Sequence, residues 1–139
     1  MSFEVQADAY ARFMGRYSDP LAVQFAAAAG VTAGRRAVDV GCGTGALTAE
    51  LADRIGAENV SAVDPSAPLL AAVRDRFPLV DVQQGTAERM PFRDGEFDFT
   101  LAQLVVHFMA DPVAGLRDMA RVTRPGGVVA GSTTAPAPN

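Results

Sequence analysis

The chain has no lysine and no tryptophan, and it has one cysteine, Cys42, and one histidine, His107. Without lysine it cannot form a Schiff base or use the lysine of a phosphate-binding loop. A single cysteine excludes an internal disulfide framework and a multi-cysteine zinc site, and a single histidine excludes a histidine-rich metal cage. We therefore expect no metal site.

Positive charge and long apolar runs are also scarce. Twelve basic residues, all arginine, stand against sixteen acidic ones, and the net charge of −4 argues against a nucleic-acid-binding surface. No apolar run approaches the roughly 18 residues that cross a bilayer. Residues 1–8 lack the basic start of a secretory signal. The expectation is a cytoplasmic protein that binds neither nucleic acid nor membrane.

The 139 residues that are present have the balance of one globular domain, with 49% hydrophobic and 20% charged residues. Short apolar runs alternate with segments of helical spacing. The expected strands cover residues 37–40, 59–63, 79–83, 97–103 and 128–131, and the expected helices cover residues 20–29, 46–55, 67–77 and 112–122. This alternation predicts an α/β fold, a doubly wound and mostly parallel sheet of about five strands with helices on both faces.

A glycine-rich loop lies between the first strand and the helix after it. Gly41, Gly43 and Gly45 let the chain turn tightly and let a ligand approach bare backbone, and the helix start adds free N–H groups. The spacing is G-x-G-x-G, with Ala46 in the sixth place of a dinucleotide fingerprint. The alternative is a strand-to-helix turn that is merely rich in glycine.

Asp64 ends the second strand, nineteen residues after Gly45. A carboxylate at that place can accept the hydroxyl groups of a ribose. It can also cap the turn at Pro65-Ser66, and the two roles do not exclude each other.

Several segments together resemble successive motifs of class I S-adenosylmethionine-dependent methyltransferases, most closely the small-molecule "type 11" branch that includes quinone-biosynthesis enzymes. They are residues 39–45 (DVGCGTG), 64–66 (DPS), 85–92 (GTAERMPF), 97–98 (FD) and 116–127 (LRDMARVTRPGG). The resemblance runs in order over residues 10–130. It implies a Rossmann-like fold, S-adenosyl-L-methionine as cofactor and a small-molecule methyl acceptor.

The resemblance also implies roles in cofactor binding. Gly41, Gly43 and Gly45 would lie along the methionine part, with Cys42 between them as a small residue or, alternatively, a nucleophile. Asp39 would lie beneath the loop and meet the ammonium group directly or through water.

The nucleoside would be held further along the chain. Asp64 would take the ribose hydroxyls, and Pro65 and Ser66 would border the adenine. Ala87 would contact the adenine by its backbone N–H and Glu88 by its carboxylate.

Other implied roles lie at the reacting centre and in an N-terminal lid. Gln103, at the end of the fourth strand, would face the reacting centre. Tyr10 and Arg16 would belong to the lid, where Arg16 either meets the methionine carboxylate or is simply solvated. Methyl transfer from a sulfonium needs a base only when the acceptor must lose a proton. His107 is the candidate for that catalytic role, and its alternative is helix packing or capping.

On this basis residues 1–34 form an N-terminal helical lid, residues 35–131 the S-adenosylmethionine-binding Rossmann-like core and residues 132–139 a loose tail. The family's sheet has seven strands, so this chain is expected to lack the last two and much of the acceptor pocket. The fifth strand would then be an exposed edge, which favours a homo-oligomer. A non-catalytic S-adenosylmethionine-binding fragment or regulatory module is the alternative function, followed by an NAD-dependent oxidoreductase.

Overall fold

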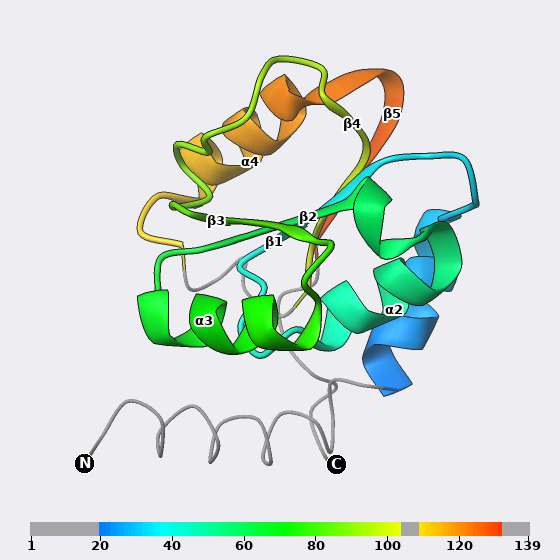
Figure 1. Ribbon diagram of the computed structural model, residues 1–139. Helices are drawn as coiled ribbons and strands as arrows, with labels where there is room; N and C mark the ends of the chain where they lie inside the picture. Colours follow the sequence, from blue (N-terminus) through cyan, green and yellow to red (C-terminus); the bar gives the residue numbers. More distant parts are fainter. Residues whose placement is uncertain (1–19, 104–108, 132–139) are drawn as a thin grey trace, which may run out of the picture.

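One parallel sheet forms the centre of the molecule. The computed structural model describes residues 20–103 and 109–131. Its strands lie side by side in the order β3-β2-β1-β4-β5, and every neighbouring pair is parallel (Figure 1). Their bounds are Ala37–Val40 for β1, Val60–Asp64 for β2, Asp81–Gln84 for β3, Phe97–Ala102 for β4 and Thr123–Gly131 for β5. The doubly wound fold expected from the sequence is confirmed.

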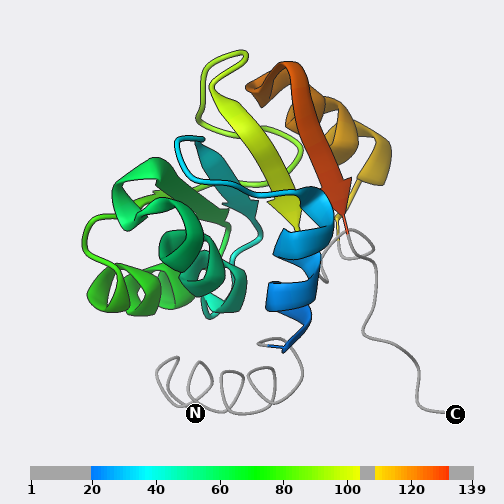
Figure 2. The ribbon, with the colours of Figure 1, turned by 90° about the vertical axis from the view of Figure 1, so that its right-hand side faces the viewer.

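Helices cover both faces of this sheet. They are the helix of residues 20–29, α2 (Ala46–Ile55), the 3-10 turn η1 (Ala57–Asn59), α3 (Ala67–Arg76) and α4 (Pro112–Val122). The helix of residues 20–29, α2 and α3 lie on one face, and α4 lies on the other (Figures 1 and 2). Because parallel strands are joined by right-handed crossovers, the reversal of strand order at β1 puts helices on opposite faces.

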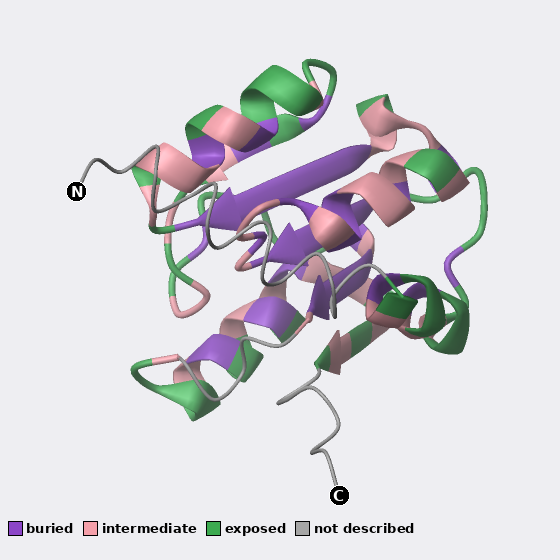
Figure 3. Ribbon diagram, turned by 90° about the horizontal axis from the view of Figure 1, so that it is seen from below, coloured by how far each residue is buried: buried purple, intermediate pink, exposed green. Residues whose placement is uncertain are grey.

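The two faces have separate hydrophobic clusters. Alternate residues of β1 divide between them, since Ala37 belongs to the cluster under α2 and α3, whereas Val38 and Val40 belong to the cluster under α4. All residues of β1 and β2 are buried, and the edge strands β3 and β5 are more exposed (Figure 3). Continuous apolar runs at the centre of the sheet follow from this double coverage.

Local signals explain where the helices begin. Ser66 accepts a hydrogen bond from the Leu69 N–H through its hydroxyl (3.4 Å) and precedes α3. Asp111 accepts from the Ala114 N–H through its carboxylate (3.1 Å) and precedes Pro112, the first residue of α4. A polar cap followed within two positions by proline is a typical helix start.

Several details differ from the sequence expectation. Strand β3 begins at Asp81 rather than Leu79 and ends at Gln84 rather than Gln83, and the bounds of β2, β4 and α3 differ by one residue. The 3-10 turn η1 was not predicted. The fifth strand begins at Thr123 rather than Val128, because Pro125-Gly126-Gly127 forms a bulge inside β5 and not a turn before it: Thr123 pairs with Phe97 and Val128 already pairs with Phe99.

The helix of residues 20–29 packs into the core rather than standing apart from it. Ala22 and Ala26 are buried in the cluster of α2 and α3. Of the lid expected over residues 1–34, residues 1–19 lie outside the described residues, as do the tail of residues 132–139 and the segment 104–108. Among the described helices, none is both long and apolar enough to cross a membrane.

Leu51 tests the cluster under α2. Its side chain is fully buried, so Leu51→Ala should lower the free energy of unfolding by about 2–5 kcal/mol. The matched control is Leu79→Ala, because Leu79 is 68% exposed and should change stability by no more than about 0.5 kcal/mol. Urea denaturation measures both. Equal losses for the two variants would contradict the placement of α2 on the sheet.

Candidate functional site

The glycine loop joins β1 to α2 at the carboxyl ends of the strands. Gly41, Gly43 and Gly45 all have positive φ angles, of 69°, 55° and 94°. The N–H groups of Gly41 and Cys42 both donate to the Val63 carbonyl oxygen of β2, at 2.8 and 3.1 Å. The loop is therefore bound to the neighbouring strand through the loop's own backbone N–H groups. Its three glycines adopt a conformation that other residues rarely take.

Gly45 also permits a close approach between two helices. A Cβ at this position would lie 3.3 Å from the Phe77 ring and 3.4 Å from Val73, at the end of α3. Arg76, in the last turn of α3, donates from its guanidinium to the Thr44 carbonyl oxygen at 2.9 Å. The loop is thus held from β2 on one side and from α3 on the other.

Asp64, the last residue of β2, connects two loops. One carboxylate oxygen accepts a hydrogen bond from the Gly43 N–H (3.0 Å), and the other accepts from the Ser66 N–H (2.8 Å). The turn-capping role considered from the sequence is therefore present in the structure. Each carboxylate oxygen has two lone pairs, so one acceptor site per oxygen remains for a further donor. The side chain is 8% exposed and borders a pocket.

Asp39 lies beneath the loop, on the face of β1 that α2 covers. It is 1% exposed and accepts a hydrogen bond from the Thr48 hydroxyl at 2.7 Å. Burial raises the pKa of Asp39 from its ordinary value of 3.8 to about 7; the Thr48 hydrogen bond acts against this shift, and the Asp64 carboxylate adds to it. Near neutral pH this carboxyl group is present in both protonation states.

Cys42 is buried within the cluster under α2 and α3. Burial, with the nearby carboxylates of Asp39 and Asp64, raises the pKa of its thiol above the ordinary value. The protonated thiol is a poor nucleophile. This environment favours the interpretation of Cys42 as a small residue in a tight turn.

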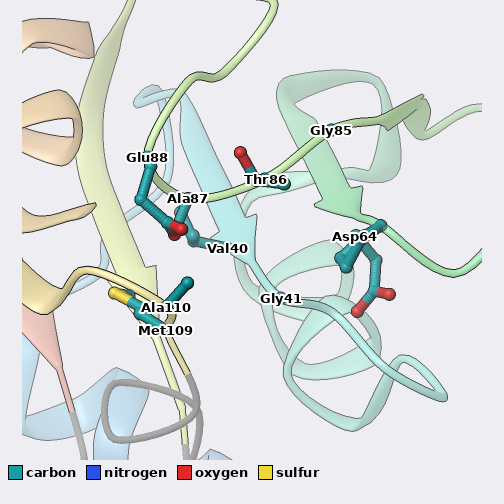
Figure 4. A pocket seen from close by; sticks show the side chains of 10 residues that line it. Val40, Gly41, Asp64, Gly85, Thr86, Ala87, Glu88, Met109 and Ala110 are labelled. Atoms are coloured by element: carbon teal, nitrogen blue, oxygen red, sulfur yellow. The ribbon is translucent and has the colours of Figure 1, made fainter. Parts of the chain in front are cut away.

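A pocket of about 340 Å³ opens beside the loop at the carboxyl ends of β1 and β2. It is lined by Val40, Gly41, Asp64, Pro65, Gly85, Thr86, Ala87, Glu88, Met109 and Ala110 (Figure 4). Asp64 lies on one side of it, Glu88 lies toward the side of Met109 and Ala110, and Val40 and Gly41 lie between these sides (Figure 4). Acidic groups therefore stand at two ends of a largely apolar cavity.

The pocket brings together some of the residues expected from the sequence. Gly41, Asp64, Pro65, Ala87 and Glu88 line it. Gly43 and Ser66 are one hydrogen bond away, through Asp64.

Among the described residues, four others that were expected at the site do not line the pocket. Asp39, Cys42 and Gly45 lie under or within the loop, and Gln103 directly follows β4. Tyr10, Arg16 and His107 lie outside the described residues.

Five lining residues were not predicted. Val40, Gly85 and Thr86 lie within the motifs of residues 39–45 and 85–92 but were assigned no role of their own. Met109 and Ala110 carry no motif. They lie between the end of β4, at the carboxyl edge of the sheet, and the start of α4.

Helix α4 holds the loop that carries Glu88. Asp118 accepts from the Met90 N–H at 2.7 Å and from Arg121 Nε at 2.7 Å. The Arg121 guanidinium also donates to the carbonyl oxygens of Met90 (3.1 Å) and Phe92 (2.9 Å). The pocket wall at Gly85–Glu88 is therefore continuous with a segment fixed to α4 by charge-assisted hydrogen bonds.

Comparison with known proteins adds to this geometry. A family model described as "Methyltransferase domain" (Methyltransf_11) matches residues 38–131, which is more than half of the chain. The chain belongs to this methyltransferase family. The matched region contains the whole sheet apart from the first residue of β1, together with the glycine loop, Asp64 and the pocket loop.

Curated relatives agree with this assignment. A demethylmenaquinone methyltransferase of Beutenbergia cavernae is 41% identical over 111 residues, 78% of this chain and 45% of the relative. An uncharacterized methyltransferase of Mycobacterium tuberculosis is 40% identical over 95 residues, 68% of this chain and 38% of the relative. The chain therefore spans less than half the length of these relatives.

Solved structures show the same fold. A SAM-dependent methyltransferase of Thermotoga maritima is 30% identical with a TM-score of 0.72, covering 91% of this chain and 57% of its own. A Haloferax volcanii methyltransferase in complex with the activator Trm112 is 25% identical with a TM-score of 0.78, covering 92% and 58%. The family's cofactor is S-adenosyl-L-methionine.

The stability of the methyltransferase domain should depend on pH through the ionisation of Asp39. Between about pH 4 and pH 7 the unfolded carboxyl is ionised while the folded one keeps its proton, so the folded state binds more protons. The free energy of unfolding should therefore fall as pH rises through this range and then level off.

The comparison variant is Asp39→Asn, whose amide oxygen can still accept from Thr48. Denaturation of both proteins from pH 4 to pH 8 measures the free energy of unfolding of each. The value for the wild type minus the value for the variant should decline as the pH rises. A difference that stays flat across this range would contradict the raised pKa.

Proposed function

We propose that this chain binds S-adenosyl-L-methionine in the pocket beside the glycine loop and forms the cofactor-binding part of a methyltransferase with a small-molecule acceptor. The observation that carries the proposal is Asp64, whose carboxylate is fixed by two backbone N–H groups at the rim of this pocket. In open parallel sheets, ligands bind at this place, where the strand order reverses.

The residues of the pocket fit the nucleoside part of the cofactor. The free lone pairs of Asp64 can accept the two ribose hydroxyls. Val40, Pro65 and Met109 offer apolar walls for a flat base, and Glu88 offers an acceptor for an exocyclic amine. A cavity of about 340 Å³ is also of the size that small-molecule sites have.

The methionine part of the cofactor fits the glycine loop, the start of α2 and the buried Asp39 beneath the loop. Gly41, Gly43 and Gly45 present backbone without side chains, and the start of α2 supplies unpaired N–H groups for a carboxylate. The buried Asp39 gives negative charge below the loop when ionised, and a nearby ammonium group would favour that form. Gln103, which directly follows β4, would face the reacting centre.

When bound, S-adenosylmethionine supplies an activated methyl group that leaves its sulfonium by in-line displacement. The protein then contributes alignment and exclusion of water rather than activation of the donor. A base is required only for an acceptor that loses a proton. His107 remains our candidate for that role.

The acceptor class rests on the relatives. Several of those that match are named demethylmenaquinone methyltransferase, which supports a small-molecule acceptor. Because the chain spans less than half of their length, their activity is extended to it only as a proposal. A purely cofactor-binding role would give binding without methyl transfer.

Calorimetry with S-adenosylmethionine and S-adenosylhomocysteine tests the site, with NAD as the control ligand. Asp64→Ala should weaken binding by about 1–3 kcal/mol, because the ribose hydroxyls lose their acceptor. The matched control is Asp81→Ala, which removes an exposed carboxylate at the start of β3, outside this pocket, and should leave affinity unchanged. Equal affinity of wild type and Asp64→Ala would refute the ribose assignment, and tight binding of NAD alone would refute the choice of cofactor.

We further propose self-association through β5. Among the described strands β5 pairs only with β4, and Val129 on it is 39% exposed. A free strand edge beside apolar side chains favours pairing with a second copy. Sedimentation at increasing concentration should show a dimer that Val129→Arg weakens. A compact monomer at high concentration would contradict this proposal.

A further inference from the structure

The pocket wall formed by Met109 rests on a glycine of α4. Gly115 is buried in the first half of that helix. A Cβ built on it would lie 2.4 Å from the Met109 sulfur and 3.5 Å from the Met109 Cγ and Cε atoms. The thioether therefore occupies the space that the side chain of any other residue at position 115 would need.

The backbone of α4 gives no reason for a glycine at this position. The Gly115 N–H donates to the Asp111 carbonyl oxygen at 2.9 Å, as in a regular helix, and the φ angle of Gly115 is not positive. Glycine weakens a helix interior relative to alanine. The contact with Met109 is the feature of this position that requires a residue without a side chain.

We propose that Gly115 is a positioning residue that sets the width of the cofactor pocket, because it lets the Met109 thioether lie against α4 instead of in the cavity. Met109 lies between the pocket and α4: it lines the pocket with Ala110 (Figure 4) and packs against Gly115 of α4. This inference rests on the proposed function and adds to it a residue that does not itself touch the ligand.

A methyl group at position 115 must displace the thioether. A distance of 2.4 Å is far below van der Waals contact, and the flexible methionine side chain yields more easily than the helix backbone. Moved away from α4, the side chain comes to lie in the pocket. Gly115→Ala should therefore weaken ligand binding about tenfold, because the displaced side chain takes up part of the space that the ligand needs.

The experiment is a double-mutant cycle on the binding of S-adenosylhomocysteine, measured by calorimetry on the full chain. Gly115→Ala should weaken binding in the wild-type background. In the Met109→Ala background, where no thioether remains to be displaced, the same change should alter the dissociation constant by less than about twofold. If Gly115→Ala alone does not fold, the double variant Gly115→Ala/Met109→Ala is the deciding measurement. A double variant that folds and binds with the affinity of Met109→Ala supports the proposal. A double variant that does not recover overturns it.

Ala120→Gly is the matched control. Ala120 is exposed on the same helix, and the change exchanges the same methyl group and the same helix propensity in the opposite direction. It should lower the melting temperature and leave affinity unchanged. An equal loss of affinity from Gly115→Ala in both backgrounds would show that Met109 is not responsible, and would overturn the proposal. A loss of the same size in Ala120→Gly would show that affinity responds to any change in α4, and would overturn it as well.

A readout without ligand separates this inference from the proposed function. The ¹³C-methyl signal of Met109 in the unliganded protein should shift in Gly115→Ala and stay in place in Ala120→Gly. A wild type that does not bind S-adenosylhomocysteine refutes the proposed function, and this inference with it. A wild type that binds, with Gly115→Ala binding equally and the Met109 signal unmoved, refutes only the role of Gly115.

Discussion

The hydrogen bonds of the Asp64 carboxylate are the interaction on which the rest of the site depends. Its two oxygens join the loop after β1, through Gly43, to the turn after β2, through Ser66. These are the segments that bound one side of the pocket. One side chain therefore shapes the rim of the pocket and still keeps one acceptor site on each of its two oxygens. Under the proposed function, these remaining sites would accept the ribose hydroxyls.

The second acidic residue of the site has a different environment because β1 has two faces. Asp39 follows Val38 and precedes Val40, so its side chain points to the face that α2 covers, where Thr48 is its hydrogen-bond partner. Asp64 stays near the surface, where its ligands are backbone N–H groups. The two carboxyl groups therefore have different environments: Asp64 is bonded to backbone N–H groups at the rim of the pocket, whereas Asp39 is buried beneath the loop with a raised pKa.

Local patterns in the sequence predicted the parts of the fold that local interactions decide. The bounds of β1 and α2 follow from a short apolar run, three glycines and the spacing of Leu47, Leu51 and Ile55, all of which lie within a few turns of chain. Asp64 was found because it ends a strand next to the glycine loop. The bulge in β5 could not be predicted, since Pro125-Gly126-Gly127 is equally typical of a turn, and only pairing with β4 decides between them.

Such local patterns could not predict contacts between segments that are far apart in the sequence. Met109 and Gly115 were assigned no relation from the sequence, because their meeting depends on how the connection after β4 enters α4. The same holds for the bonds of Arg121 to the carbonyl oxygens of Met90 and Phe92, which lie about thirty residues earlier. The resemblance of motifs singled out the glycine loop, but it could not show which side chains support the opposite wall of the pocket.

The bonds from Arg121 and Asp118 have a consequence for the opening motions of the protein. Amide protons in irregular loops usually exchange fast with solvent, yet the Met90 N–H is bonded to a helical carboxylate, and the carbonyl oxygens of Met90 and Phe92 are bonded to a guanidinium of the same helix. We therefore expect the loop and α4 to open together as one cooperative unit. Protection of this loop against hydrogen exchange would then report the local unfolding of a helix that follows it by more than twenty residues.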